Sequence, residues 1–232
     1  MDAQPTAPLP GPPRPAAPRP GAPRSTEFGP LRIGWDDRVL EPRPWTTAQA
    51  EWGAALLTAG PRGDVLELCA GAGQIGLLTA LGAGRALVMV DADPVACAWA
   101  RTNAAARGGD GRVEVRCSPL EEALTPRERF ALVQADPPWV PSDLTGQHPR
   151  DPLRAIDGGP AGLDVAVVCL QVAAGALLPG GSVLLQLGTE AQVDALGPDA
   201  ARLGLALQEV RTFPRGVVAH YRPAAVPGAS GA

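Results

Sequence analysis

The chain has 232 residues, a net charge of −4 and 20 basic residues, all of them arginine. This length fits one α/β domain with a sizeable core rather than two full domains, and the mildly acidic balance excludes the overall basic footprint typical of nucleic-acid or anionic-membrane binding. Cys69, Cys97, Cys117 and Cys169 form no Cys-x-x-Cys pair, which indicates neither a metal cage nor a disulfide framework.

The two ends of the chain differ in composition from the middle. Residues 1–30 are dominated by Pro, Ala, Gly and Arg, and residues 223–232 are similar, so we predict disordered tails around one domain at 31–222. No stretch is apolar enough to span a bilayer, and the N-terminus has no signal-peptide core. We therefore expect a cytoplasmic protein.

From residue 64 onward, apolar runs of strand length alternate with alanine-rich helical stretches. The expected elements in chain order are a strand at 65–69, a helix at 74–81, a strand at 86–90, a helix capped by Asp93-Pro94, strands at 113–117 and 130–133, a helix at 163–178 ended by Pro179-Gly180-Gly181, a strand at 183–187, a helix at 191–203, and strands at 205–211 and 217–221. The last two strands are close enough to form an antiparallel hairpin. The predicted fold is α/β, a single Rossmann-like, doubly wound sheet of seven strands with this hairpin at its edge.

Polar signals follow the first, second and fourth expected strands, at Gly71, Asp91 and Asp136. In open parallel sheets, ligands bind outside the carboxyl ends of the strands, where the strand order reverses. We therefore expect these three positions to face one crevice.

The turn after the first strand, from Gly71 to Gly76, matches the G-x-G-x-x-G fingerprint, and Asp91 follows at the interval of a ribose-binding acid. By itself this pattern indicates NAD, and the glycines fit ordinary turns equally well. Glu67, inside the strand just before the turn, favours another ligand, because a carboxylate there can meet an amino-acid ammonium. S-adenosylmethionine carries such an ammonium, and NAD does not.

The segment Asp136-Pro137-Pro138-Trp139 ends the fourth expected strand. Prolines lack amide hydrogens and hold the backbone extended, so their carbonyl groups are free to accept. A planar NH2 group between the Asp136 carboxylate and the Pro137 carbonyl donates both hydrogens in its own plane, on which the Trp139 ring can stack. This predicts methylation of a planar nitrogen. The alternative is a loop in which two prolines stop a strand.

With the glycine turn, Asp91 and the Asp-Pro-Pro-Trp motif in this order, the chain resembles class I S-adenosylmethionine-dependent methyltransferases. Three segments, Glu41-Pro-Arg-Pro-Trp-Thr46, Asp136-Pro-Pro-Trp-Val-Pro141 and Ala155-Ile-Asp-Gly-Gly-Pro-Ala-Gly-Leu-Asp164, are similar to the HemK-type glutamine N5-methyltransferase family. The similarity covers roughly residues 31–221, and the Asp-Gly-Gly segment is its most specific part.

The resemblance implies that S-adenosylmethionine is the cofactor, that no metal is used, and that the catalytic residues are Asp136, Pro137, Pro138 and Trp139. It implies a cofactor site made of Thr46, Glu67, Cys69, Ala70, Gly71, Ala72, Gly73, Asp91, Ala92, Ser118, Leu120 and Asp136.

The sequence also departs from the family pattern. Members usually have Asn-Pro-Pro-Tyr where this chain has Asp136 and Trp139, and they often have Glu where it has Gln186. Pro119 replaces the family's Asp in the loop after the third strand, so we expect the backbone around Ser118 and Leu120 to hold adenine. From this comparison with the family we expect the proline-rich residues 1–30 to take the place of the helical N-terminal domain that helps bacterial members recognise release factors.

The resulting hypothesis is methyl transfer to a glutamine or similar amide of a protein or peptide. Two alternatives remain open: methylation of an exocyclic amine of a nucleobase in RNA or DNA, and a catalytically inactive cofactor-binding module. Residues 141–162 are expected to form a lid or substrate-recognition loop, and His148 within them a surface histidine.

Overall fold

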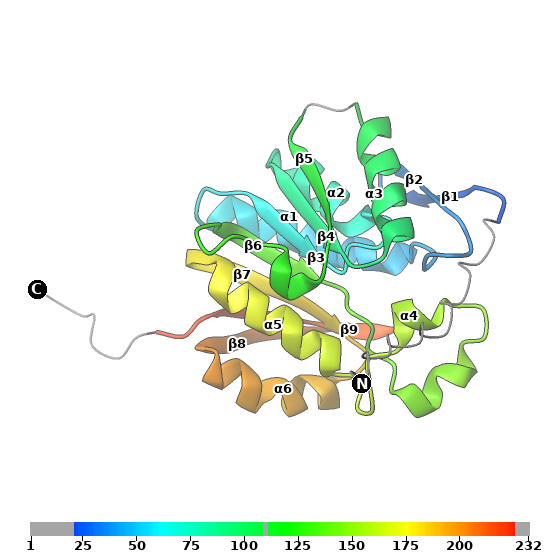
Figure 1. The fold of residues 1–232 in the computed structure, drawn as a ribbon. Helices are drawn as coiled ribbons and strands as arrows, with labels where there is room; N and C mark the ends of the chain where they lie inside the picture. The colour runs from blue at the N-terminus through cyan, green and yellow to red at the C-terminus, as the bar shows by residue number, and fades with distance from the viewer. Residues whose placement is uncertain (1–20, 109–110, 226–232) are drawn as a thin grey trace, which may run out of the picture.

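A computed structural model describes residues 21–108 and 111–225. Seven strands of these residues form one sheet in the order β5-β4-β3-β6-β7-β9-β8 (Figure 1). The strands are β3 (Val65–Leu68), β4 (Leu87–Asp91), β5 (Val113–Cys117), β6 (Phe130–Ala135), β7 (Leu177–Leu187), β8 (Leu205–Phe213) and β9 (Gly216–Pro223). The first five run parallel, and β9 pairs antiparallel with both β7 and β8. The predicted Rossmann-like sheet and its C-terminal hairpin are confirmed.

Helices cover both faces of this sheet (Figure 1). One face carries α1 (Thr47–Ala59), α2 (Gln74–Ala83) and α3 (Pro94–Ala106), and the other carries α5 (Asp164–Ala176) and α6 (Glu190–Arg202). As predicted, α3 begins at Asp93, whose side chain accepts from the Val95 amide, with Pro94 in the first turn. None of the helices in the described ranges has the length and hydropathy needed to span a membrane.

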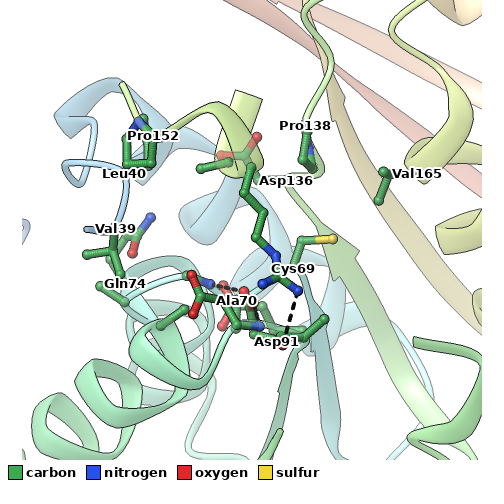
Figure 2. Close-up of a pocket in the computed structure, with 18 of the residues that line it drawn as sticks. Val39, Leu40, Cys69, Ala70, Gln74, Asp91, Asp136, Pro138, Pro152 and Val165 are labelled. Carbon is green, nitrogen blue, oxygen red and sulfur yellow. Dashed lines mark hydrogen bonds between the residues drawn. The ribbon is translucent and has the colours of Figure 1, made fainter. Parts of the chain in front are cut away.

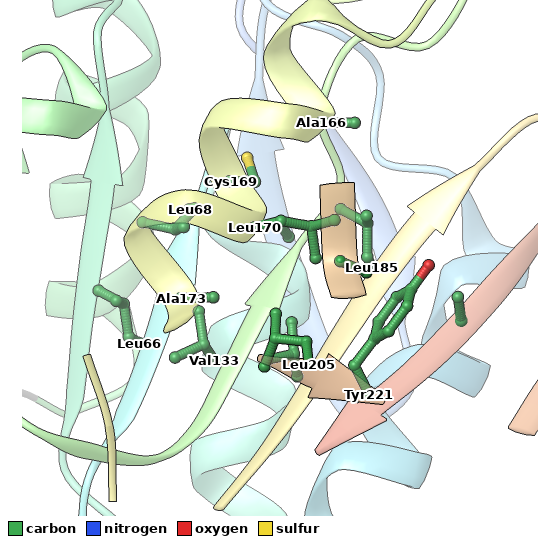
Figure 3. Close-up of a cluster of buried hydrophobic side chains, with 14 of the residues drawn as sticks. Leu66, Leu68, Val133, Ala166, Cys169, Leu170, Ala173, Leu185, Leu205 and Tyr221 are labelled. Atoms are coloured by element: carbon green, nitrogen blue, oxygen red, sulfur yellow. The ribbon is translucent and has the colours of Figure 1, made fainter. Parts of the chain in front are cut away.

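The core forms because strand residues alternate between the two helical layers. Leu66 and Leu68 of β3 pack with α5 and α6, whereas Val65 of the same strand packs with α1 and α2. Figure 3 shows Cys169, Leu170 and Ala173 of α5 lying over the sheet. The central strands are apolar on both faces because both are covered, as expected for a parallel sheet. This rigid support fixes where the carboxyl ends of the strands lie.

Regular structure begins before residue 31, the predicted start of the domain. Residues Arg24–Phe28 form β1, which pairs antiparallel with β2 (Leu31–Trp35), and Phe28 is fully buried. A proline-rich composition hid this short strand, which pairs with β2, and β2 in turn packs against α2 and α3. At the other end, β9 extends to Pro223, one residue into the predicted C-terminal tail. Residues 1–20 and 226–232 lie outside the described residues, so disorder there stays a prediction.

The break expected at Pro179-Gly180-Gly181 is also misplaced. Helix α5 ends at Ala176, and the chain enters β7 directly at Leu177. The Pro-Gly-Gly segment is accommodated inside β7 as an irregularity, where pairing with β6 shifts between Phe130 and Leu132. Gly180 has a φ of 76°, which suits such a bulge.

A buried asparagine joins the β1–β2 hairpin to the main domain. The Asn103 side chain, on α3, accepts from the Gly34 amide at 2.8 Å and donates to the Gly34 and Ala72 carbonyls at 2.9 Å each. One side chain thereby links β2, α3 and the glycine turn after β3. The hairpin is thus held against the edge of the candidate site.

We predict that Asn103→Ala lowers the free energy of unfolding by about 2–3 kcal/mol, because it leaves polar backbone groups without partners. Urea denaturation followed by circular dichroism measures this loss. Thr102→Ala on the exposed side of α3 is the control, and we expect it to change stability by less than about 0.5 kcal/mol. Equal effects of the two substitutions would contradict the anchoring role of Asn103.

Candidate active site

A cavity of about 280 Å³ opens at the carboxyl ends of β3, β4 and β6 (Figure 2). In the figure, Cys69 lies between Asp91 and Asp136, which come from different strands. Nine of the residues predicted to bind a cofactor line this cavity: Glu67, Cys69, Ala70, Gly71, Ala72, Asp91, Ala92, Leu120 and Asp136. The sheet therefore brings Gly71, Asp91 and Asp136, which lie at the ends of separate strands, to one cavity, as predicted.

Three residues predicted for the same site do not line the cavity. Thr46 is buried, and its hydroxyl donates to the Arg43 carbonyl at 2.8 Å. Gly73, with a φ of 83°, caps α2 and lies against Met89 and Ala100. The Ser118 hydroxyl donates to the carbonyl of the neighbouring proline. Their predicted contacts with a cofactor remain predictions.

Several residues that line this cavity were not predicted from the sequence to bind a cofactor. Arg38, Val39 and Leu40 follow β2, and Pro152, Arg154 and Ala155 come from the segment around the short helix α4 (Leu153–Ile156). Neither segment has the periodic apolar pattern that reveals a strand or helix. Pro152, Arg154 and Ala155 fall within residues 141–162, which we predicted to form a lid or substrate-recognition loop rather than part of the cofactor site.

The glycine turn and Asp91 hold each other in place. Asp91 accepts from the Gly71 amide and from the Asp93 amide, each at 2.8 Å. Cys69, two residues before Gly71, has a φ of 56°, an uncommon conformation for a residue with a side chain. Burial raises the pKa of Asp91 despite these two amide donors. The carboxylate is therefore fixed in position, while its remaining lone pairs face the cavity.

Glu67 is a buried residue in the wall of the cavity. Its Oε1 accepts from the Gly76 amide at 2.9 Å, and within the described residues its Oε2 has no hydrogen-bond partner. A Cβ atom at position 76 would collide with Oε2, so glycine there makes room for the carboxyl group. Burial, and to a smaller degree Asp136 and Asp91, raises the pKa of Glu67 to about 8. A cationic ligand would satisfy this group.

Asp136 stands at the end of β6 beside Gln186 of β7. Gln186 Nε2 donates to Asp136 Oδ1 at 2.6 Å. Desolvation of the carboxyl group raises its pKa to about 7, and the charge of Arg43 opposes that rise. Asp136 can therefore exist with or without its proton near neutral pH.

A second, smaller cavity of about 70 Å³ adjoins the first. Asp136, Leu40 and Ala155 line both cavities, Pro138 lines the larger one, and Pro137 and Trp139 line the smaller one. The Asp-Pro-Pro-Trp motif thus forms the boundary between two compartments. This geometry places a carboxylate where a ligand in one compartment meets a ligand in the other.

Residues 141–162 cover the smaller cavity from outside. Arg43 pairs with Asp151 at 2.7 Å, and the Ser142 hydroxyl donates to Asp157 at 2.6 Å. His148 lines the smaller cavity, within this covering segment. The position suits the predicted lid or recognition loop, a role that remains a prediction.

The electrostatics of the cavity favour a cation. Glu67, Asp91 and Asp136 all have raised pKa values, so a positive charge nearby would stabilise their ionised forms. The negative charge of a pyrophosphate would be repelled by these three carboxylates, although Arg38 and Arg154 also line the cavity. Arg38 is committed to a salt bridge with Asp36. The site therefore fits a sulfonium and ammonium compound better than a dinucleotide.

Sequence comparisons agree with this interpretation. A family model described as "Methyltransferase small domain" matches residues 53–147. The release factor glutamine methyltransferase of Deinococcus radiodurans is 35% identical over 166 residues, which cover 69% of this chain and 58% of that protein. The ribosomal protein uL3 glutamine methyltransferase of Burkholderia pseudomallei is 30% identical over 174 residues, with 69% and 57% covered. The chain spans little more than half the length of these relatives.

Solved structures show the same fold at low identity. The ribosomal protein L11 methylase of Lactobacillus delbrueckii matches with a TM-score of 0.61 at 12% identity, over 81% of this chain and 82% of that one. The hMettl16 catalytic domain in complex with an RNA hairpin matches with a TM-score of 0.68 at 15% identity, over 85% and 78%. These likenesses support the fold alone.

We predict that Glu67→Gln gains stability relative to the wild type as the pH rises from about 5 to about 8. Because the pKa of Glu67 is raised, the folded protein binds the Glu67 proton more tightly than the unfolded chain does. Protonated Glu67 therefore makes its full contribution to the free energy of unfolding below its ordinary pKa of 4.5, and this contribution is lost as the pH rises to about 8. Between these pH values, the difference in the free energy of unfolding between the variant and the wild type changes by at most about 5 kcal/mol. Urea denaturation at several pH values measures it, and a difference independent of pH would refute the assignment.

Proposed function

Because this chain belongs to the class I methyltransferases and resembles their HemK-type members, we propose that it is an S-adenosylmethionine-dependent N-methyltransferase acting on a glutamine or similar amide of a protein. The observation that carries this proposal is the position of Asp136 on the boundary between the two cavities. Relatives named for glutamine methylation of a release factor and of ribosomal protein uL3 support the acceptor class. A cytoplasmic location follows from such substrates.

The larger cavity is the proposed cofactor site. The unpaired Glu67 Oε2 suits the amino-acid ammonium, directly or through water, and Asp91 suits the two ribose hydroxyl groups. Leu120 offers an apolar contact for adenine on the far side. When bound, S-adenosylmethionine supplies an electrophilic methyl group on a positively charged sulfur.

The smaller cavity is the proposed acceptor site. A volume of about 70 Å³ holds only a few water-sized groups, which matches the three heavy atoms of a carboxamide better than a purine ring. Pro137 and Trp139 border this space, so a planar amide can be held there by contact with the ring. The specific argument for a side-chain amide over a nucleobase is that the curated relatives are named for glutamine methylation.

In the proposed mechanism the protein aligns the nitrogen and removes competing water. Asp136 accepts a hydrogen bond from the acceptor NH2 group, which holds the nitrogen lone pair toward the larger cavity. As the new carbon–nitrogen bond forms, the nitrogen becomes positively charged and must release a proton. Because the pKa of Asp136 is near neutrality, its carboxylate can take that proton. The bound cofactor would supply the methyl group and its sulfur would keep the electron pair of the broken bond, so charge and atoms would balance.

We predict that wild-type protein binds S-adenosylmethionine and not NAD in isothermal titration calorimetry, and that Asp91→Ala weakens binding roughly 30- to 100-fold. This corresponds to two hydrogen bonds from ribose to a carboxylate, about 1–1.5 kcal/mol each. Asp91→Asn keeps one acceptor oxygen, so we expect a smaller loss. Asp143→Ala, in the covering segment, is the control and should bind like the wild type. Binding of NAD would overturn the cofactor assignment.

We predict that the protein transfers a methyl group from labelled cofactor to a glutamine of release factor or ribosomal protein uL3, with mass spectrometry locating the modified residue. Asp136→Asn should reduce kcat by about 10²-fold or more, because the proton acceptor is lost, while cofactor affinity changes less than about threefold. Methylation of RNA or DNA, weakening steeply with salt, would instead identify a nucleobase enzyme. Cofactor binding without transfer to any acceptor would identify the inactive module.

A further inference from the structure

We propose that Gln186 is a positioning residue for methyl transfer: its amide NH2 group fixes the Asp136 carboxylate, and its free carbonyl oxygen accepts a hydrogen from the acceptor nitrogen. This inference rests on the proposed function and extends it to a residue on the neighbouring strand. It assigns two acceptor oxygens to the NH2 group, one from Asp136 directly after β6 and one from Gln186 of β7, which takes the role expected from the sequence for the Pro137 carbonyl.

The first support is the hydrogen bond itself. Gln186 Nε2 donates to Asp136 Oδ1 at 2.6 Å, across adjacent parallel strands. The amide must be the donor when Asp136 is ionised, since a carboxylate has no hydrogen to give. With Oδ1 engaged, Oδ2 is the oxygen left to face the acceptor. The rotation of the carboxyl group is therefore set by Gln186.

The second support is the unused half of the glutamine amide. Gln186 is only 2% exposed, and its Oε1 finds no hydrogen-bond partner among residues 21–108 and 111–225. A buried carbonyl oxygen without a donor costs free energy, which a bound N–H group would recover. Gln186 lines the 70 Å³ cavity together with Asp136 and Trp139. The missing donor is thus expected from the occupant of that cavity.

A buried glutamine one strand away provides a matched comparison. Gln134 of β6 is fully buried, and its Oε1 accepts from the Thr79 hydroxyl at 3.0 Å on the face covered by α1 and α2. Its Nε2, like Gln186 Oε1, has no hydrogen-bond partner among the described residues, but Gln134 lines neither of the two cavities, so of these two amides only that of Gln186 has its unpaired atom beside a cavity. It shares residue type, burial and strand environment with Gln186 but lacks contact with Asp136.

The charge environment of Asp136 is defined by groups from every surrounding element. These are Glu67 of β3, Asp91 of β4, Arg43 before α1, His148, Asp151, Arg154 and Asp157 of the covering region, and Arg215 of the β8–β9 turn. Gln186 carries no charge and differs from these residues in donating a hydrogen bond directly to the Asp136 carboxylate. Its replacement changes a hydrogen bond and leaves the formal charge unaltered.

The first test compares Gln186→Met with the control Gln134→Met. We expect Gln186→Met to lower kcat for the protein acceptor about 10- to 100-fold, with KM for the acceptor and cofactor affinity changed less than about threefold. Loss of the donated hydrogen bond disfavours the ionised carboxylate, so the rising limb of the pH profile of kcat should move upward by about one pH unit. Gln134→Met should affect melting alone. Identical kinetics of the two variants would overturn the proposal.

The second test exchanges the two functional groups. Asp136→Asn and Gln186→Glu should each reduce kcat more than tenfold, whereas the double variant should recover at least part of the loss. In the double variant, the amide at 136 can donate to the carboxylate at 186, so the pair is restored with its total charge unchanged. A double variant no better than the worse single variant would contradict a functional pair. This cycle remains informative if Gln186→Met proves unstable.

A measurement without turnover separates the two proposals. Carbon-13 NMR of labelled aspartate reports the pKa of Asp136 in the cofactor-free protein. If wild type methylates no acceptor but Gln186→Met raises that pKa, the pair stands and the proposed function fails. If wild type methylates glutamine but the pKa and kcat are unaffected by Gln186→Met, the role of Gln186 is refuted and the function stands.

Discussion

The enclosure of three carboxyl groups at one edge of the sheet is the constraint on which the site depends. Removing a carboxylate from water is unfavourable unless donors or cations replace the solvent. Glu67 and Asp91 receive backbone amide hydrogens from the glycine turn and the start of α3, and Asp136 receives one from Gln186. The donors are too few to offset burial, as the raised pKa values show. A cationic ligand would offset the rest of the free-energy cost of burying these carboxylates, so the arrangement favours binding of a cation.

Local backbone geometry makes this enclosure possible. Gly76 leaves room for the Glu67 carboxyl group, and the left-handed conformation of Cys69 turns the chain so that the Gly71 amide reaches Asp91. Asn103 then ties the same turn to the β1–β2 hairpin. The strain at Cys69 is carried by a sheet whose two faces are fully packed. Stability of the core and geometry of the site are therefore linked through the carboxyl ends of the strands.

Sequence patterns predict the parts of this structure that repeat or that follow local rules. Apolar runs located every strand of the main sheet, and the positions of Asp91 and Asp136 after them placed both residues in one cavity. Boundaries failed where tertiary pairing overrides local preference, as at Pro179-Gly180-Gly181, which joins β7 as a bulge, and at β1, whose short strand is stabilised by packing. Arg38 and Arg154 reach the cavity from irregular segments, which carry no period. Gln186 was visible only as a departure from a family pattern, because its contact with Asp136 crosses two strands.

The structural likenesses include enzymes named for protein and for RNA, so the fold does not choose the acceptor. We propose that this choice is made in the smaller cavity, where Gln186 donates a hydrogen bond to Asp136. A carboxylate paired with a neutral amide offers one oxygen that can take up a proton and one carbonyl oxygen that cannot. Such a pair suits a planar NH2 group, which must lose one proton after methylation while its orientation is held. Two carboxylates would repel or share a proton, and two amides could not take one up. In the proposed mechanism, this asymmetric pair provides one charged and one neutral acceptor for the two hydrogens of a planar nitrogen. The charged member takes up the one proton that must leave after methyl transfer, and the neutral member keeps the nitrogen oriented.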